Sequence, residues 1–246
     1  MAEAIARPAL SVLIPVYNEI ATIAQILVAV ARALPGVDKE IVIVDDGSTD
    51  GTRAWLQQTF GETSAARLAD RTVVKILLHD RNRGKGAAVR TAAAASTGEV
   101  VVIQDADLEY DPADWAAMYA LIADRNVADV VYGSRFQGGA HRSLYILNRA
   151  GNRVISTLFN LLYNQTLTDI ETCYKMFTRE VLQSLALSVD GFGIEVQISA
   201  QIALARRWRI YEMGIQYFGR TYAEGKKIHW TDGAKALWYL LKYRFG

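Results

Sequence analysis

The chain has 246 residues, of which 51% are hydrophobic, and a formal net charge of +1. This length suffices for one large α/β domain with a sizeable core, and a net charge near zero gives no electrostatic reason to expect a nucleic acid partner. The single cysteine, Cys173, excludes an internal disulfide and a cysteine-rich zinc site, so we expect a reducing, cytoplasmic setting. We expect no signal peptide, because the N-terminus lacks a basic stretch followed by a long apolar run, and no transmembrane helix, because no window reaches about 18 consecutive apolar residues.

Short runs of apolar and β-branched residues alternate with helical patterns through the first half of the chain. Helix-like spacing or composition occurs between these runs, at 20–34, 51–58, 85–96 and 111–124. This alternation predicts a mainly parallel sheet with helices on both faces. The predicted strands are LSVLIPV (10–16), EIVIV (40–44), VVKILL (73–78), EVVVI (99–103) and ADVVYG (128–133).

The second half has longer helical patterns. We predict a helix over 143–164 and a strand near 171–177, then a helix near 192–207 and a strand over 209–218. A basic, glycine-containing loop follows, and the last 15 residues before the terminal glycine predict a final helix. Neither an internal repeat nor a linker-like boundary occurs, so we predict one domain.

The stretch VVIQDADLEYDP places Asp105, Asp107, Glu109 and Asp111 at alternate positions directly after an apolar run. On extended backbone, side chains two residues apart point the same way, so these carboxylates are expected to converge. Hard oxygen ligands of this kind suit Mg²⁺ or Mn²⁺. A solvated acidic turn explains the stretch equally well on its own.

Other polar motifs follow the predicted strands, and the carboxyl ends of parallel strands meet at one edge, where ligands bind. PVYNE offers Tyr17 for base stacking, and VDDGSTDG offers Asp46 for a ribose or base N–H. RNRGKG places Lys85 at a helix start, where a phosphate is plausible. Arg220 and Lys226, in the loop GRTYAEGKKI, suit a diphosphate. Neither G-x-G-x-x-G nor G-x-x-x-x-G-K-[ST] occurs, which argues against an NAD-dependent enzyme and a P-loop enzyme.

These motifs together resemble the family 2 glycosyltransferases with the GT-A fold, a Rossmann-like α/β fold. Within that family the sequence is most similar to dolichyl-phosphate mannose synthase-like and polyprenyl-phosphate sugar transferases. The resemblance runs from about residue 10 to 230. It rests on SVLIPVYNE, IVIVDDGSTDGT, NRGKGAAVRTA, VVIQDADLEYDP, VVYGSRF, DIETCYKMFTREV and YFGRTYAEGKK.

The resemblance implies a single GT-A domain over 1–246, with a nucleotide-binding half at about 8–135 and an acceptor half at about 136–246. It implies a nucleotide sugar of the GDP-mannose or UDP-glucose type as donor, and Mg²⁺ or Mn²⁺ held by Asp107 and Glu109. Arg135, Arg149 and Arg153 would bind the acceptor phosphate. The nucleotide-sugar site would comprise Pro15, Tyr17, Glu19, Val44, Asp46, Asp105, Ala106 and Arg220.

The acceptor decides the chemistry of the expected inverting transfer. A polyprenyl phosphate is already anionic near neutral pH and needs no general base. A hydroxyl of a lipid such as ceramide or diacylglycerol, or of a glycan, needs a carboxylate to take its proton, and Asp169 or Glu195 is the candidate. Glu195 is equally well explained as an acid on a helix surface. An inactive subunit that binds nucleotide sugars is the alternative outside enzymes.

Two further features of the second half bear on the acceptor. Arg142, Arg149 and Arg153 recur at spacings of seven and four residues, which brings the last two to one helix face, and arginine forks match phosphate oxygens. The helix over 143–164 and the segment Leu237–Phe245 carry apolar faces with basic and aromatic residues. We therefore expect peripheral contact with the cytoplasmic face of a membrane.

Overall fold

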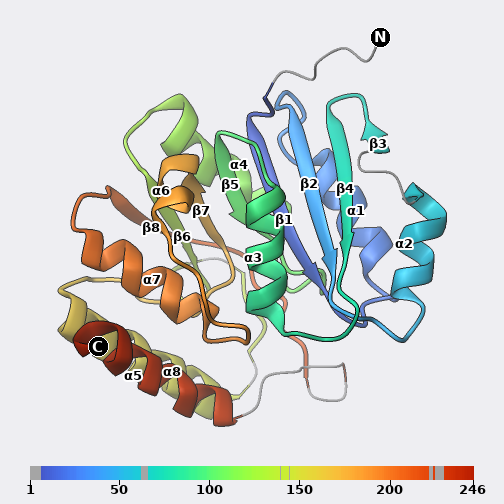
Figure 1. Cartoon of the computed structure of the whole chain (residues 1–246). Coiled ribbons are helices and arrows are strands. Elements are labelled where there is room, and N and C mark those ends of the chain that lie inside the picture. The colour runs from blue at the N-terminus through green and yellow to red at the C-terminus, as the bar shows by residue number, and fades with distance from the viewer. Residues whose placement is uncertain (1–6, 62–65, 139, 144, 222–223, 225–229) are drawn as a thin grey trace.

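The computed structural model describes residues 7–61, 66–138, 140–143, 145–221, 224 and 230–246. Within these residues eight strands form one sheet, in the order β3-β4-β2-β1-β5-β7-β6-β8 (Figure 1). Six strands run parallel, and β3 and β7 run against them. The strands are β1 (Leu10–Val16), β2 (Lys39–Asp45), β3 (Ala66–Ala69), β4 (Thr72–Leu78), β5 (Val100–Ile103), β6 (Val130–Ser134), β7 (Lys175–Thr178) and β8 (Ile210–Gly214).

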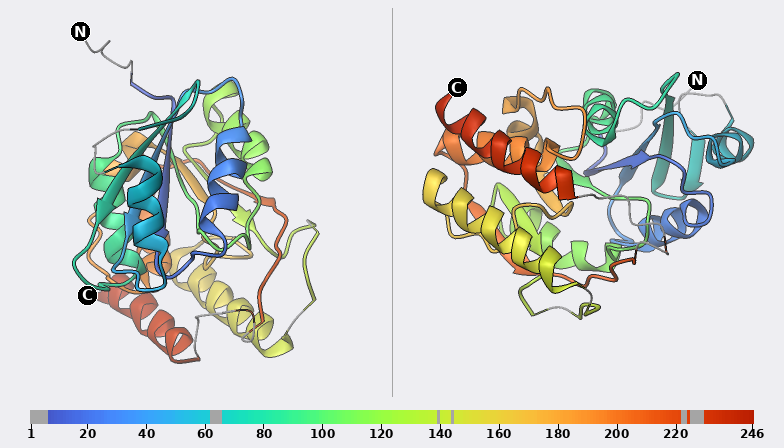
Figure 2. Two further views of the ribbon diagram at one scale, coloured as in Figure 1. Left: turned by 90° about the vertical axis from the view of Figure 1, so that its right-hand side faces the viewer. Right: turned by 90° about the horizontal axis from the view of Figure 1, so that it is seen from below.

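Helices cover both faces of the sheet. Figures 1 and 2 show α3 and α6 on one face and α1 and α4 on the other, while α5, α7 and α8 pack together beside β6 and β8. The mainly parallel α/β class predicted from the sequence is therefore confirmed. The helices are α1 (Ile23–Arg32), α2 (Thr52–Phe60), α3 (Lys85–Ala95), α4 (Trp115–Tyr119), α5 (Ile146–Tyr163), α6 (Arg179–Ser184), α7 (Ile194–Ala205) and α8 (Trp230–Phe245).

The core explains why the central strands are almost wholly apolar. β1, β2 and β5 are covered on both faces, so their side chains are buried along nearly their whole length.

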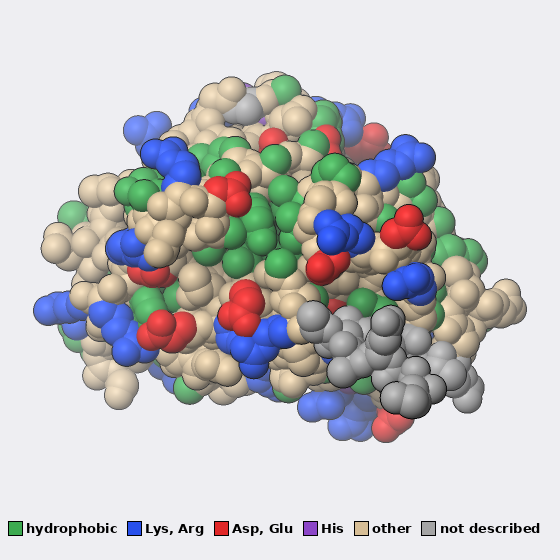
Figure 3. All heavy atoms as spheres, turned by 90° about the horizontal axis from the view of Figure 1, so that it is seen from above, with side chains coloured by type: hydrophobic (Ala, Val, Ile, Leu, Met, Phe, Trp, Pro, Cys, Tyr) green, Lys and Arg blue, Asp and Glu red, His purple; other side chains and the backbone are tan. Residues whose placement is uncertain are grey.

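The sheet has two edges at which strands begin or end. At the edge where the parallel strands begin, acidic and basic side chains are interspersed around apolar ones (Figure 3). The polar sequence motifs lie at the opposite edge, where these strands end.

Several element predictions need correction. The segment predicted as one helix over 111–124 is a 3₁₀ turn, a short α4 and a π turn in succession. The strand predicted over 209–218 ends at Gly214. The strand predicted near 171–177 begins only at Lys175, so the residues before it cross the carboxyl edge as irregular chain. β3 and α6 were not predicted, since four and six residues give too little periodicity.

Candidate active site

The acidic row after β5 turns rather than continuing as a strand. β5 ends at Ile103, and Leu108 has a φ of 63°, in the left-handed region. The Glu109 N–H donates to Asp107 Oδ1 at 3.1 Å, and this closes the turn. Asp111 instead accepts from Ala113 N at 2.9 Å and caps the following 3₁₀ turn. The predicted convergence therefore involves part of the row, and a turn rather than strand alternation produces it.

Asp107 and Glu109 converge with Glu19 on the guanidinium of Arg220. Arg220 lies 3.0 Å from Asp107 Oδ2, 3.3 Å from Glu109 Oε1 and 3.3 Å from Glu19 Oε2. Its backbone N–H also donates to Glu109 Oε1 at 2.9 Å. Three segments far apart in sequence, after β1, β5 and β8, thus supply one cluster. We call these four residues the acidic cluster.

The charge balance of the acidic cluster favours a second cation. Three carboxylates face one guanidinium. Burial and then the carboxylates of Asp105 and Glu109 raise the pKa of Asp107 to about 7, against the lowering effect of Arg220. Asp107 and Glu109 contact the same guanidinium, so their oxygens face one position, and their chemistry suits Mg²⁺ or Mn²⁺. Among the residues that the structure describes, no group of three or more acidic, histidine or cysteine side chains has the arrangement that would hold a metal ion.

Lys85, the first residue of α3, is held between two carboxylates. Its Nζ lies 2.9 Å from Asp105 Oδ1 and 3.2 Å from Glu195 Oε1. Glu195 also pairs with Lys175 at 2.6 Å and is buried, which excludes the interpretation of Glu195 as an acid on a helix surface. The ion pairs form one row of alternating charge, whose members in order are Asp105, Lys85, Glu195 and Lys175.

Asp46 lies beside a pocket at the end of β4. Its carboxylate accepts from Arg83 N and Gly84 N at 2.9 and 2.7 Å and lies 2.6 Å from His79 Nδ1. Gly47 has a φ of 79°, and a Cβ there would come within 2.5 Å of Asn82 N, so glycine allows the two loops to pack. The pocket, of about 350 Å³, is lined by Leu78, His79, Asp80, Arg81 and Arg83.

The other residues predicted for the nucleotide-sugar site differ in access. Tyr17 is exposed and Pro15 partly exposed, both at the end of β1. Val44 and Ala106 are buried in the core, so their side chains pack against apolar neighbours. Lys226 lies outside the described residues.

A second cluster holds the arginines. Asp169 is fully buried and binds Arg135 through both oxygens, at 2.7 and 2.8 Å. The Arg135 guanidinium lies 5.5 Å from the ring centroid of Phe136, and that of Arg149 lies 5.6 Å from the same centroid. Arg149 and Arg153 are exposed on α5. We call Arg135, Phe136 and Arg149 the arginine cluster.

Arg142 does not join the arginine cluster. Its Nη1 lies 2.7 Å from Glu224 Oε2 and donates to the carbonyl of Gly219 at 3.3 Å. It therefore ties the segment after β6 to the segment after β8. The sequence spacing grouped it with Arg149 because both are arginines near one helix start, but Arg142 precedes α5 and points elsewhere.

Two site residues were missed from the sequence. Tyr217 donates its hydroxyl to Glu109 Oε2 at 2.8 Å, and its ring lies 5.4 Å from the Arg135 guanidinium. Glu171 is partly buried at the same edge, and burial raises the pKa of its carboxyl to about 7. Glu171 stands within a motif already noted, so the sequence contained a signal for it. Tyr217 gave no signal, because only the fold brings it to Glu109.

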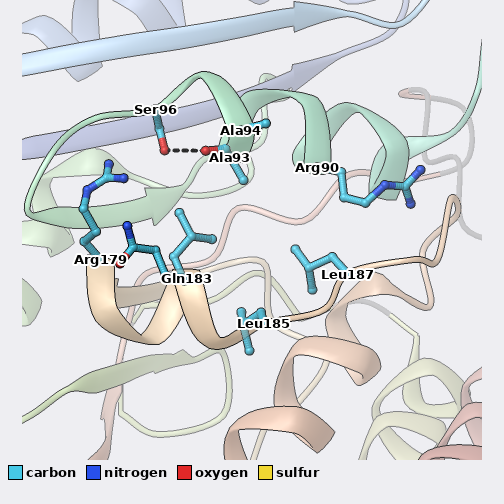
Figure 4. A pocket seen from close by; sticks show the side chains of 9 residues that line it. Arg90, Ala93, Ala94, Ser96, Arg179, Gln183, Leu185 and Leu187 are labelled. Carbon is cyan, nitrogen blue, oxygen red and sulfur yellow. Dashed lines mark hydrogen bonds between the residues drawn. The ribbon is translucent and has the colours of Figure 1, made fainter.

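A further pocket of about 370 Å³ lies away from both clusters, between the second half of α3 and α6 (Figure 4). Several of its polar groups are already bonded within the chain: Arg90 pairs with Asp190 at 2.6 Å, and Ser96 Oγ donates to Ala93 O at 2.8 Å. It is lined by Arg90, Ala93, Ala94, Ser96, Arg179, Leu182, Gln183, Leu185 and Leu187.

Comparison with known families gives the same assignment as the motifs. The sequence profile of glycosyl transferase family 2 matches residues 11–186, more than two thirds of the chain. The chain belongs to glycosyltransferase family 2. The match begins in β1 and includes every residue of the acidic cluster except Arg220.

Two curated relatives of this family 2 chain are sugar transferases by name, and the name of the second includes dolichol phosphate. Glycosyltransferase AglJ of Haloferax volcanii is 31% identical over 196 residues, 79% of this chain and 58% of that protein. Dolichol-phosphate mannosyltransferase of Pyrococcus furiosus is 27% identical over 222 residues, 89% of this chain and 60% of that protein. The chain thus spans about three fifths of the length of these two relatives.

A solved structure confirms the fold. Glucosyl-3-phosphoglycerate synthase of Mycobacterium tuberculosis, crystallised with Mn²⁺ and UDP-glucose, superimposes with a TM-score of 0.70 at 18% identity. The match covers 96% of this chain and 79% of the synthase. The GT-A fold expected from the sequence is therefore confirmed.

Proposed function

We propose that the protein transfers a hexose from a nucleotide sugar of the GDP-mannose or UDP-glucose type to a polyprenyl phosphate, with inversion and with Mg²⁺ or Mn²⁺. One observation carries the proposal. At one edge of the sheet, Tyr217 contacts both an acidic cluster that suits a metal diphosphate and an arginine cluster that suits a phosphate monoester. The name of the P. furiosus relative supports a lipid-phosphate acceptor, and so does that of undecaprenyl-phosphate 4-deoxy-4-formamido-L-arabinose transferase of Proteus mirabilis, 25% identical over 177 residues, 71% of this chain and 50% of that protein.

The donor would bind across the ends of β1, β2, β4 and β5. The pocket beside Asp46 and the exposed ring of Tyr17 suit a nucleoside, and Asp105 follows β5, the strand next to β1. Asp107 and Glu109 would hold the metal ion, which when bound stabilises the charge on the leaving diphosphate. Arg220 would then exchange its carboxylate partners for diphosphate oxygens, which guanidinium matches equally well.

The acceptor would approach from the arginine cluster. Arg149 and Arg153 are exposed and suit a phosphate group, while Arg135 is oriented by its two bonds to Asp169. A phosphate oxygen attacks the anomeric carbon from the face opposite the diphosphate, a new C–O bond forms, and the bond to the nucleoside diphosphate breaks. The phosphate monoester is anionic near neutral pH, so no residue has to remove a proton.

A hydroxyl acceptor is the second candidate, and Glu171 is the observation that favours it. Asp169 is bonded to Arg135, and Glu195 is bonded to two lysines. Both carboxylates are therefore occupied by ion pairs and are poorly placed to take a proton from an acceptor. Glu171 is partly exposed, and its carboxyl pKa of about 7 suits proton transfer near neutral pH. In this case Glu171→Gln abolishes transfer to ceramide or a glycan but not to polyprenyl phosphate.

We further propose that α5 and α8 rest on a membrane surface, where a polyprenyl phosphate resides. No helix of the described chain is long and apolar enough to cross a bilayer. The two helices lie side by side (Figure 2), and each exposes large apolar side chains. Ile146, Leu147 and Leu161 of α5 are 76–81% exposed, and Trp238, Leu241 and Phe245 of α8 are 53–73% exposed. Lys242 lies near the Trp238 ring and Arg244 near the Phe245 ring, and both cations suit anionic headgroups.

A matrix of donors and acceptors tests the proposed function. GDP-mannose, UDP-glucose and UDP-N-acetylglucosamine are each incubated with Mn²⁺ and with polyprenyl phosphate, ceramide or no acceptor, and product is measured by mass spectrometry. We expect product with polyprenyl phosphate and one of these donors. Product with ceramide alone would favour the second candidate. Nucleotide sugar binding without turnover under any condition would indicate an inactive binding subunit.

A further inference from the structure

We infer that Tyr217 is a positioning residue that connects the donor-side carboxylate Glu109 to the acceptor-side guanidinium of Arg135. The inference rests on the proposed function for the roles of Glu109 and Arg135. Tyr217 itself lies outside the segment matched by the family profile, in the chain between β8 and Arg220.

The hydroxyl of Tyr217 fixes one side of the Glu109 carboxylate. It donates to Oε2 at 2.8 Å, while Oε1 accepts from the backbone N–H and the Nε of Arg220 at 2.9 and 3.3 Å. The two oxygens thus have different partners. If the Arg220 side chain moves to a diphosphate, the Tyr217 hydroxyl and the Arg220 N–H are the contacts that still orient Glu109. Partners of metal ligands in this position commonly tune metal affinity.

The ring of Tyr217 supports the arginine cluster. The Arg135 guanidinium lies 5.4 Å from the Tyr217 ring centroid and 5.5 Å from that of Phe136. Both rings are therefore within cation–π range of Arg135. Arg149 contacts the same Phe136 ring. A chain of contacts therefore runs from Glu109 through Tyr217, Arg135 and Phe136 to Arg149.

The backbone around Tyr217 is anchored well enough to hold both contacts at once. Tyr217 N donates to Ala140 O at 2.9 Å, and Arg142 N donates to Tyr217 O at 3.0 Å. Phe218 N donates to Glu109 O at 2.9 Å, and the Tyr110 ring packs 5.3 Å from the Tyr217 ring. Tyr217 is thus bonded to the segments after β5 and after β6, which carry Glu109 and Arg135.

Two substitutions separate the hydroxyl from the ring. Tyr217→Phe keeps the ring beside Arg135 and removes the donor to Glu109, whereas Tyr217→Leu removes both. A matched control is Tyr132→Phe, which removes a hydroxyl in the buried interior that is bonded to Ser199 at 3.2 Å and not to a residue of either cluster. Circular dichroism and the melting temperature report whether each variant folds.

Metal affinity and acceptor KM are measured for each variant. Electron paramagnetic resonance gives the Mn²⁺ Kd in the presence of GDP or UDP, and steady-state transfer gives the KM for polyprenyl phosphate. We expect Tyr217→Phe to weaken Mn²⁺ binding about tenfold or more and to leave the acceptor KM unchanged. Tyr217→Leu should weaken Mn²⁺ binding to the same extent and also raise the acceptor KM severalfold. Tyr132→Phe should change neither.

Three results would overturn the inference. They are a Mn²⁺ Kd for Tyr217→Phe within twofold of the wild type, a wild-type protein that binds no Mn²⁺, and an acceptor KM raised equally in Tyr217→Phe and Tyr217→Leu. Failure of the proposed function looks different: a wild-type protein that binds Mn²⁺ with nucleotide but transfers no sugar. In that case the Mn²⁺ comparison alone decides the role of Tyr217.

Discussion

The acidic cluster and the arginine cluster share one edge of the sheet but are built in different ways. In the acidic cluster Arg220 is already paired with three carboxylates, and Lys85 nearby is paired with two. In and beside the arginine cluster, Arg135 is paired, but Arg149 and Arg153 are exposed on α5. A ligand at the first cluster must therefore exchange partners, whereas a ligand at the second can bind to cations that are already accessible.

The difference predicts how each cluster responds to substitution. Loss of a carboxylate from the acidic cluster leaves Arg220 and the remaining acids to rearrange, so both metal binding and turnover should change together. Loss of an exposed arginine from α5 should remove only the proposed contact with the acceptor phosphate.

Asp107→Asn should lower turnover at least about 100-fold, the scale for loss of a main electrostatic stabiliser of the leaving group. Its carboxylate faces Arg220 at 3.0 Å, and burial and then the charges of Asp105 and Glu109 raise its pKa to about 7. Steady-state transfer with saturating Mn²⁺ measures the effect. Asp111→Asn is the control, since Asp111 belongs to the same row but only caps a 3₁₀ turn. Full wild-type activity in excess EDTA would contradict a metal role.

Arg149→Ala should lower kcat/KM for polyprenyl phosphate about 10–100-fold, since a hydrogen bond to a charged group contributes roughly 1.5–3 kcal/mol. Nucleotide affinity should stay unchanged, because the proposed function assigns the nucleotide to the acidic cluster and the acceptor phosphate to the arginine cluster. Calorimetric titration with GDP or UDP checks that point. Arg207→Ala is a close control: Arg207 is also exposed and stacks on an aromatic ring, Trp208, at 4.1 Å, but it precedes β8 at the opposite edge. Weakened nucleotide binding by Arg149→Ala would assign Arg149 to the donor instead.

Much of the fold and part of the site followed from the sequence. The central strands are contiguous apolar runs with polar motifs at their ends, so the strands and the edge that their motifs share could be predicted. Side-chain pairing could not. Lys85 was assigned to a phosphate by its place at a helix start, yet it pairs with Asp105 and with Glu195, 110 residues further along the chain. Such contacts depend on where the fold places α3, α7 and the end of β5 relative to one another, which local patterns do not encode.

The apolar surface of α5 and α8 should bind anionic vesicles at low salt, and its loss should weaken binding about fivefold. Leu147 and Leu241 are 81% and 53% exposed, and each leucine side chain gains about 1.5–3 kcal/mol only on full burial, so partial insertion gains less. The double variant Leu147→Ser, Leu241→Ser is compared with the wild type by flotation. Leu204→Ser on α7, an exposed leucine outside this surface, is the control. Equal flotation of wild type and double variant would assign the surface to another contact.

Substitution of Glu171, which precedes β7 at the carboxyl edge, should have the smallest of these effects. The quantity that changes is the stability of the folded protein. Burial raises the pKa of its carboxyl from 4.5 to about 7 in the folded state, so the folded protein binds this proton more tightly than the unfolded chain. Its contribution to stability is full below about pH 4.5 and is lost as the pH rises through 7. Glu171→Gln lacks this loss and should be more stable than the wild type at pH 8, with the difference shrinking toward pH 5.

Water screens this partly exposed carboxylate, so the free-energy difference at pH 8 should be on the order of 1 kcal/mol, or about 2–4 °C in melting temperature for a chain of this size. Melting curves at pH 5 and pH 8 measure it. Glu180→Gln, at an exposed position on α6, should shift the melting temperature equally at both pH values. A Glu171→Gln variant with a constant shift would mean that the carboxyl is fully solvated. It would then belong with the accessible groups beside α5 rather than with the buried charges, and the case for Glu171 as a general base would fall with it.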